Sequence, residues 1–428
     1  MAGFMVYTNP LLGHIYPTVP TLVELRRRGH EVVVYSAASA TGPLRALGIE
    51  ALAVDPALER VESDDWQART PIGAQKRDVR TLVRRAELEI PEMQRAVERH
   101  RPDALLIDVT AFGASTIAEK SGLPWAHAVH FPLPVPSRDT PPYGLGLRPR
   151  GDLLGRIRDA LAERLALRPL GRIVVRELNP VRTAAALPAV RAAADYFSAA
   201  PLILYYTAEP FEYPRSDWPP NVRLVGPGAW EPLVERLDWL DAIDRPVVLV
   251  SCSSDFQNDG KLVRFALEAL ADEEVFVVAT TAAVDPATFT APPNARVERY
   301  LPHGPIIRRA ACVVCHAGMG VTQKALVAGV PVCAVPFGRD QFEVARRVEV
   351  SDAGIRLPAA RLRTDRLRIA VRTAMGKTPG ARQVAAGFAD AGGSAAAADA
   401  LEQLVAGGSP AGGRSREPSS TPTAHLET

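Results

Sequence analysis

Several features are scarce in this 428-residue sequence, and each scarcity excludes a class of protein. Four cysteines are too few for a disulfide scaffold and favour a reducing compartment. No apolar stretch approaches the roughly 20 residues of a membrane span, and the first residues lack the pattern of a signal peptide. Basic and acidic residues nearly balance, 50 against 48, so the charge predicts no nucleic-acid partner. We therefore expect a cytoplasmic protein, a monomer or a homodimer.

What the sequence has is a repeated alternation of short apolar runs and longer amphipathic segments. Alternating strands and helices predict parallel α/β sheets with helices on both faces. In the first half, strand-like runs lie at 4–8, 31–35, 49–54, 104–108, 125–128 and 202–206, with helix-like segments at 15–28, 73–99, 111–120 and 153–194. In the second half, they lie at 247–252, 275–280, 295–298, 311–315 and 332–335, with helices at 260–270, 305–309, 319–328, 340–350, 364–375 and 394–405.

The length predicts more than one domain. Residues 1–208 form the first predicted domain, and residues 233–390 form the second. Between them, residues 209–232 carry six prolines and are predicted to be an interdomain linker. Residues 407–428 are rich in Gly, Ser, Pro and Thr and are predicted to be a disordered tail.

The most informative stretch is 313–341, which is predicted to form strand, tight turn, helix, turn and strand. His316 ends the first strand, and Gly318 and Gly320 follow before the helix. Backbone amides and the dipole at a helix N-terminus favour an anion, and glycines allow it to approach closely. We interpret this turn, with the backbone of Met319, as a pyrophosphate site; the alternative is an ordinary strand-to-helix turn.

A second candidate site follows the first strand, in NPLLGHIYPT. His14 is expected at a helix N-terminus, where the partial positive charge would lower its pKa and favour the neutral, basic form. Asp108 ends another strand of the same sheet, so both side chains are expected in one crevice. Asp108 would then orient the imidazole. The alternatives are that His14 caps a turn and that Asp108 caps the next helix.

The stretch 313–341, VVCHAGMGVTQKALVAGVPVCAVPFGRDQ, resembles the donor-binding motif of the GT-B glycosyltransferases that attach sugars to natural products, of the macrolide and UDP-glucuronosyl type. The resemblance extends over about residues 3–405. It implies two Rossmann-like, doubly wound domains facing a central cleft, with a final helix, 391–406, that crosses back to the first domain. It also implies inverting transfer of a hexose from a nucleoside diphosphate sugar to an O–H or N–H of an apolar aglycone, in secondary-metabolite or antibiotic biosynthesis.

For the donor, the resemblance implies that His316 and the glycine-rich turn hold the diphosphate and that Asp340 and Gln341 hold sugar hydroxyls. Tyr300 and Leu301 resemble the segment that cradles the base. Ser253 and Ser254 follow a strand, so their hydroxyls are candidates for phosphate oxygens. Asp340 also precedes Glu343 by three residues, which fits a helix capping box instead. The sequence has no Asp-x-Asp, so we expect no metal and no further cofactor.

One residue departs from the family pattern. Members that use uridine diphosphate sugars often carry a glutamate eight residues after the phosphate histidine, where it accepts from the ribose hydroxyls. Lys324 stands at that position, and an ammonium group has no acceptor. The departure favours a dTDP-deoxysugar as donor over a UDP-sugar, which stays open.

The acceptor is expected in the first domain, beside four aromatic residues in or near loops at strand ends: Trp66, Phe112, Phe131 and Tyr143. Apolar and aromatic walls suit an apolar aglycone, although each ring could serve packing alone.

Other functions remain as alternatives. They are a nucleotide-sugar epimerase of similar fold, a catalytically silent binding or activator protein and, more remotely, a nicotinamide oxidoreductase, for which the third glycine of the dinucleotide motif is missing.

Overall fold

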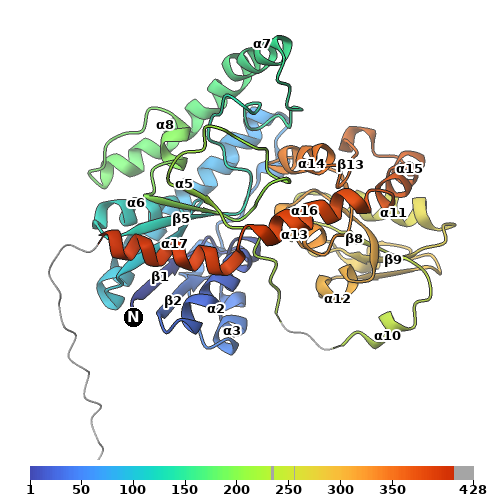
Figure 1. Ribbon diagram of the computed structural model, residues 1–428, viewed down its shortest axis with the longest axis horizontal. Helices are drawn as coiled ribbons and strands as arrows, with labels where there is room; N and C mark the ends of the chain where they lie inside the picture. Colours follow the sequence, from blue (N-terminus) through green and yellow to red (C-terminus); the bar gives the residue numbers. More distant parts are fainter. Residues whose placement is uncertain (233–235, 255, 409–428) are drawn as a thin grey trace, which may run out of the picture.

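The computed structural model describes residues 1–408 except 233–235 and 255, and these residues form two parallel sheets with helices on both faces (Figure 1). The first sheet has the order β3-β2-β1-β4-β5-β6-β7, with β1 (Gly3–Tyr7), β2 (Glu31–Ser36), β3 (Glu50–Ala53), β4 (Ala104–Asp108), β5 (Trp125–Val129), β6 (Leu202–Tyr205) and β7 (Val222–Leu224). The second has the order β10-β9-β8-β11-β12-β13, with β8 (Val247–Ser251), β9 (Phe276–Thr280), β10 (Ala295–Glu298), β11 (Ala310–Cys315), β12 (Val332–Ala334) and β13 (Gly354–Arg356). The predicted pair of doubly wound α/β domains is confirmed.

The helices of the first domain are α1 (Leu12–Ile15), α2 (Val19–Arg27), α3 (Ala38–Ala46), α4 (Pro56–Glu59), α5 (Pro71–His100), α6 (Phe112–Ser121), α7 (Leu153–Ala162), α8 (Arg168–Ala184) and α9 (Ala193–Phe197). Those of the second half are α10 (Asp238–Asp241), α11 (Lys261–Leu270), α12 (His303–Ile307), α13 (Met319–Val327), α14 (Gln341–Val350), α15 (Thr364–Met375), α16 (Thr378–Asp390) and α17 (Gly393–Gly408). No helix among the described residues is long and apolar enough to pass through a bilayer.

The strands at the centre of each sheet are buried along their length, as expected for parallel sheets covered on both faces. Every residue of β4 and of β8 is buried. The helices thus leave only the strand ends accessible, and the carboxyl ends are where the loops with polar residues begin. This layout places the candidate site at the ends of β1, β4, β8 and β11.

The segment predicted as a linker, residues 209–232, is more structured than its prolines suggest. Val222–Leu224 forms β7, which pairs in parallel with β6 at the edge of the first sheet. Phe211 packs instead against Phe388 in the core of the second domain. The predicted boundary at residue 208 is therefore too early. A three-residue edge strand such as β7 is too short to show a periodic pattern. The sequence analysis did not predict β13 for the same reason.

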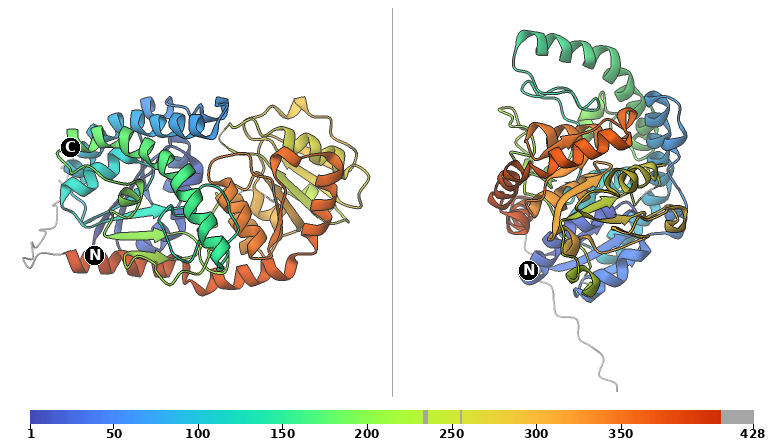
Figure 2. Two further views of the ribbon diagram at one scale, coloured as in Figure 1. Left: turned by 90° about the horizontal axis from the view of Figure 1, so that it is seen from above. Right: turned by 90° about the vertical axis from the view of Figure 1, so that its right-hand side faces the viewer.

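Helix α17 lies along the first domain, as the red helix at the lower left of the left-hand view in Figure 2 shows. Ala397, Ala398 and Leu401 join the core cluster of that domain, and Arg28 donates to Asp399 and Glu402 at 2.6 and 2.8 Å. The end of the chain thus ties the two domains together. Of the predicted tail, residues 407 and 408 end α17, and residues 409–428 lie outside the described residues.

Candidate active site

A cavity of about 1820 Å³ is lined by both domains. His14 contributes to its wall from the first domain, and His316 contributes from the second. The other expected site residues that line it are Ser253, Ser254, Tyr300, Leu301, Gly318, Met319, Gly320, Asp340, Trp66, Phe112, Phe131 and Tyr143. Asp108 lies behind His14, and Gln341 does not line the cavity.

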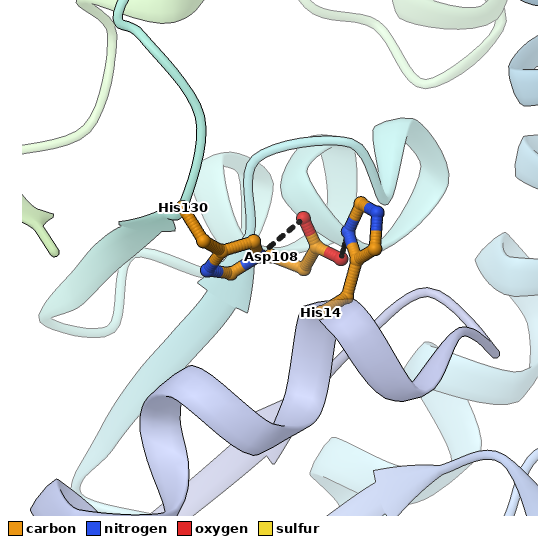
Figure 3. A group of neighbouring side chains, drawn as sticks. All are labelled: His14, Asp108 and His130. Atoms are coloured by element: carbon orange, nitrogen blue, oxygen red, sulfur yellow. Dashed lines mark hydrogen bonds and ion pairs between the residues drawn. The ribbon is translucent and has the colours of Figure 1, made fainter. Parts of the chain in front are cut away.

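His14 and Asp108 form a direct pair (Figure 3). His14 lies in the four-residue helix α1, and its Nδ1 is 2.7 Å from Oδ2 of Asp108 at the end of β4. The Asp108 side chain is fully buried, whereas that of His14 is 22% exposed toward the cavity. Since Nδ1 faces the carboxylate, Nε2 is the nitrogen left to exchange a proton with a bound molecule.

The hydrogen bonds around Asp108 hold it rigidly. Oδ2 also accepts from the backbone N–H of Asn9 at 3.1 Å, and Oδ1 accepts from the N–H and the hydroxyl of Thr110 at 2.9 and 3.0 Å. Asp108 therefore serves both as the turn residue before α6 and as the partner of His14. The alternative that Asp108 caps α6 is wrong, because Ala111 is the N-cap of that helix and no side chain caps it.

The expected direction of the His14 pKa is wrong. Burial lowers the pKa of His14, but the charge and hydrogen bond of Asp108 outweigh burial and raise it above the ordinary value of 6.5. The expected effect of a helix N-terminus is missing, because α1 has only one turn and His14 lies in its last positions. Burial opposes ionisation of Asp108, yet its two histidine neighbours hold the pKa of its carboxyl well below the usual range.

His130 is a third member of this group that the sequence analysis missed. Its Nε2 lies 3.5 Å from Oδ1 of Asp108, its ring meets the His14 ring edge-on at 5.1 Å, and it lines the cavity. Burial lowers the pKa of His130, which favours the neutral ring. The signal that could have found it is its place directly after β5, the same strand-end rule that selected Asp108.

Ligand atoms of His14, Asp108 and His130 lie within 4.8 Å of one another, so these side chains are also the candidate metal ligands among the described residues. The carboxylate oxygens, however, already accept hydrogen bonds from His14, Asn9 and Thr110. These hydrogen bonds fix the position of the Asp108 carboxylate. Binding of a metal would require breaking them.

In the second domain, the turn after β11 presents an imidazole above a helix N-terminus. Ala317 adopts a left-handed backbone with φ of 66°, and Gly318 is the N-cap of α13. A side chain on Gly318 would lie 2.2 Å from Nε2 of His316, so that nitrogen sits directly over the turn. A side chain on Gly320 would meet nothing within 4 Å. The open space beside these amides has the character of an anion site.

His316 differs from His14 in its surroundings. It is 8% exposed, and burial lowers its pKa below 6.5. The closest carboxylate, Asp259 Oδ2, lies 3.9 Å from its Nδ1. A neutral imidazole keeps one N–H, which can donate to an anionic oxygen. Asp259 follows β8 by eight residues, and nothing in the sequence marks it as a neighbour of His316.

Asp340 and Gln341, to which the family resemblance assigns the same role in binding sugar hydroxyls, have different surroundings. Asp340 lines the cavity at the N-cap position of α14 without a capping hydrogen bond, and burial raises its pKa to about 6. Glu343 bonds instead to the amides of Gly144 and Gly146 in the first domain, so the capping-box alternative is wrong.

Gln341 is buried, and its Oε1 accepts from the amides of Phe337 and Gly338 at 2.8 and 3.1 Å. Its Nε2 donates to Gln257. These bonds shape the loop before α14, and they are a structural role that the sequence did not reveal. Gln341 thus does not line the cavity, and its predicted contact with sugar hydroxyls stays a prediction.

The aromatic residues expected at the acceptor site fall into two kinds. Phe112 is 2% exposed and packs edge-on against Tyr196, so it belongs mainly to the core. Trp66 is 40% exposed, and its ring meets Phe256 of the second domain at 4.9 Å. Phe131 and Tyr143 are half-buried and line the cavity, and Phe131 also packs against the core of the first domain.

The residues around the expected nucleobase and ribose site include an ion pair. Tyr300 is 63% exposed at the cavity wall beside Leu301. The ammonium of Lys324 lies 3.4 Å from Oε2 of Glu231, and both residues line the cavity. Glu231 also accepts from the Gly304 amide at 2.6 Å. The carboxylate beside Lys324 thus comes from the segment between the domains, and both of its oxygens are already engaged, one by the ammonium and one by the Gly304 amide.

Comparison with known proteins agrees with this architecture. Residues 264–404 match the family model of the erythromycin biosynthesis protein CIII-like C-terminal domain. The 4'-demethylrebeccamycin synthase of Lentzea aerocolonigenes is 33% identical over 392 residues, which cover 87% of this chain and 92% of that protein. A PGL/p-HBAD biosynthesis rhamnosyltransferase of Mycobacterium bovis is 37% identical over 188 residues, 44% of this chain and 41% of that one.

Among solved structures, the spinosyn rhamnosyltransferase SpnG superposes with a TM-score of 0.70 at 19% identity, covering 93% of this chain and 99% of that one. It has also been solved with thymidine diphosphate and with spinosyn aglycone. At this identity the likeness shows the fold, and the rebeccamycin relative covers nearly the whole chain. The chain belongs to the GT-B glycosyltransferases of antibiotic biosynthesis.

Proposed function

We propose that this glycosyltransferase moves a sugar from a nucleoside diphosphate sugar to an O–H or N–H of an apolar natural-product aglycone, with inversion and without a metal. The observation that carries the proposal is the shared cavity. A histidine bonded to a carboxylate and an anion-binding turn, from different domains, line one space of about 1820 Å³. That volume exceeds the roughly 300–1,000 Å³ of ordinary small-molecule pockets, and it suits two substrates together.

In the proposed reaction, Nε2 of His14 takes the proton from the acceptor as the acceptor attacks the anomeric carbon. Asp108 orients the ring and stabilises the imidazolium that forms. The bond from the anomeric carbon to the phosphate oxygen breaks, and the diphosphate leaves with the electron pair. His316 and the amides at the start of α13 stabilise its charge. A single displacement inverts the anomeric centre.

For the donor, we favour a dTDP-deoxysugar over a UDP-sugar. Lys324 offers a ribose hydroxyl no acceptor, so the extra 2'-hydroxyl of a ribonucleotide gains little there. A spinosyn rhamnosyltransferase of the same fold binds thymidine diphosphate, which supports this choice. The measurement is a thermal-shift titration in which TDP should stabilise the protein more than UDP does. The opposite order would overturn the choice of donor.

For the acceptor, the first-domain wall of the cavity suits a flat or greasy molecule. Phe131, Tyr143 and Trp66 contribute rings to it, and Asp340 faces the space from the donor side. We infer an aglycone of secondary metabolism, as the name of the rebeccamycin relative suggests.

The decisive experiment is a transfer assay with dTDP- and UDP-sugars against a panel of apolar aglycones, read by mass spectrometry. His14→Ala should reduce transfer about 10²- to 10⁴-fold and should keep stabilisation by TDP. His100→Ala, outside the cavity, is the matched control and should retain activity. Wild-type protein that binds donor and transfers to none of the panel would favour the activator alternative. Full activity in His14→Ala would refute the assigned base.

A further inference from the structure

Helix α7 and the π-helical turn that follows it, Glu163–Leu167, carry apolar side chains on the face that points away from the molecule. Leu153, Leu154, Ile157, Leu161 and Leu165 are between 49% and 71% exposed. Leu154, Ile157, Leu161 and Leu165 recur at the spacing of one helix face. We call these five residues the α7 apolar face. Isolated exposed leucines need no explanation, but an aligned group marks an interaction site.

The opposite face of the same helix points into the cavity and is polar. Arg156, Asp159 and Glu163 line the cavity, together with Ala160 and Leu167. This is the reverse of an ordinary surface helix, which buries its leucines and exposes its charges. In Figure 1, α7 stands at the edge of the first domain, beyond α8 and away from both sheets. The second view in Figure 2 shows the same projection. None of these five leucine and isoleucine side chains lines the cavity, so substrate binding does not account for them.

The segment that carries the α7 apolar face is strongly basic. Residues 148–176 hold eight arginines against three acidic residues, a net charge of +5 in a chain whose total is +2. Two of the acidic side chains are paired locally, Asp152 with Arg150 and Asp159 with Arg158. Arg148, Arg164 and Arg176 are exposed and do not line the cavity, whereas Arg168 and Arg172 do line it. Apolar insertion combined with cations that can reach phosphate is the pattern of a helix that lies in a bilayer interface.

We propose that the α7 apolar face docks the enzyme on an anionic lipid surface, with the acceptor half of the cavity next to the bilayer. Leucines would enter the acyl region, and the arginines would bind lipid phosphates. A second copy of the chain fits less well, because a two-fold contact brings the same basic surface against itself. The arrangement gives an apolar acceptor a short path from lipid to the cavity that lies on the other side of α7.

The test is co-sedimentation of the full chain with vesicles and requires neither donor nor acceptor. Wild-type protein should bind vesicles of phosphatidylcholine mixed with phosphatidylglycerol, bind pure phosphatidylcholine more weakly, and lose binding as salt rises. The double variant Leu154→Glu/Leu161→Glu should bind at least about tenfold less. Ile369→Glu, which changes an equally exposed side chain on α15 of the second domain, should bind as wild type does. TDP should stabilise both variants as it stabilises the wild type, which shows that they fold.

A second measurement places the contact on α7 directly. The four native cysteines are buried, so Leu161→Cys and Ile369→Cys can each be labelled selectively with a polarity-sensitive dye. Only the dye at position 161 should shift to the blue when anionic vesicles are added. Absence of wild-type binding to anionic vesicles, or equal binding by the double variant, overturns the proposal. So does a wild-type dimer that Leu161→Glu converts to a monomer without changing vesicle binding, which would assign the face to a second copy.

Discussion

Two histidine–aspartate pairs occupy corresponding places in the two domains, with the residue types exchanged. In the first domain, His14 follows β1 and Asp108 ends the neighbouring strand β4. In the second, Asp259 lies in the loop after β8, and His316 follows the neighbouring strand β11. The first pair is in contact at 2.7 Å, whereas the second is separated by 3.9 Å.

Because of this difference in contact, the pKa values of the two imidazoles shift in opposite directions. Oδ2 of Asp259 is occupied by the amide of Ser253 at 2.8 Å and by Gln257 at 3.2 Å, so it does not bond to His316. Burial then decides the pKa of His316 and lowers it, while Asp108 raises that of His14. In the proposed reaction, the same two residue types would provide a proton acceptor in one domain and a hydrogen-bond donor in the other.

The largest expected effect comes from breaking the first pair without changing its shape. Asp108→Asn should lower kcat about 10²- to 10⁴-fold, because the amide can neither stabilise the imidazolium nor hold the correct tautomer. Steady-state kinetics with the identified donor and acceptor provide the measurement. Asp259→Asn is the matched control and should leave kcat within a few-fold of wild type. Equal losses in both variants would show that the two pairs do not have different roles.

Removing the ring of the second pair should affect donor binding. His316→Ala should weaken TDP binding by about 10- to 100-fold, the usual cost of losing a hydrogen bond to a charged group. Isothermal titration calorimetry measures it, and His14→Ala should bind TDP nearly as tightly as the wild type. TDP affinity that is unchanged in His316→Ala would remove this residue from the diphosphate site.

The pH dependence tests the opposite tuning. Because the His14 pKa is raised, the fraction of neutral base falls as pH decreases through a value above 6.5. We expect kcat/KM to fall about tenfold per pH unit below that value. In the residual activity of Asp108→Asn, this acid limb should move to lower pH, because the carboxylate that raises the pKa is absent. An acid limb below pH 6 in the wild type would contradict the tuning of His14.

Two neighbouring glycines separate positioning of the ring from space for the ligand. In Gly318→Ala, the new methyl group would collide with Nε2 of His316, so TDP affinity should fall about tenfold. Gly320→Ala has free space and should leave the melting temperature unchanged, and it should weaken TDP only if the ligand approaches these amides closely. Calorimetry and thermal melts of both variants are the measurement. A fully active Gly318→Ala would mean that the ring can move without cost.

The smallest expected effect is on the preference between UDP and TDP, at the expected ribose site. Lys324→Gln introduces an amide oxygen that can accept from a ribose hydroxyl, so the affinity for UDP should rise relative to TDP by about two- to tenfold. Competition of both nucleotides in a binding assay measures the ratio. Lys261→Gln, at the cavity wall in the first turn of α11, is the control and should leave the ratio unchanged. A ratio that does not change in Lys324→Gln would place the ribose elsewhere.

Much of the site was predictable because strand ends in a parallel sheet share one edge. His14, Asp108 and His316 were found in this way, and the structure brings them to one cavity or directly behind its wall. His130 obeys the same rule and was missed, although it directly follows β5. Asp259 could not have been found, since its position depends on how a loop folds back against β11.

The alternation of apolar runs and amphipathic segments by itself determined two doubly wound domains and the edges at which chemistry occurs, because burial on both faces of a sheet requires that pattern. Only the tertiary structure decided which carboxylate bonds to which imidazole, that the Gln341 side chain hydrogen-bonds to the loop before α14, and that the leucines of α7 face outward. These features depend on hydrogen bonds and exposures between segments distant in sequence. Local propensity carries no information about such contacts, and a shift of about 1 Å is enough to reverse a pKa.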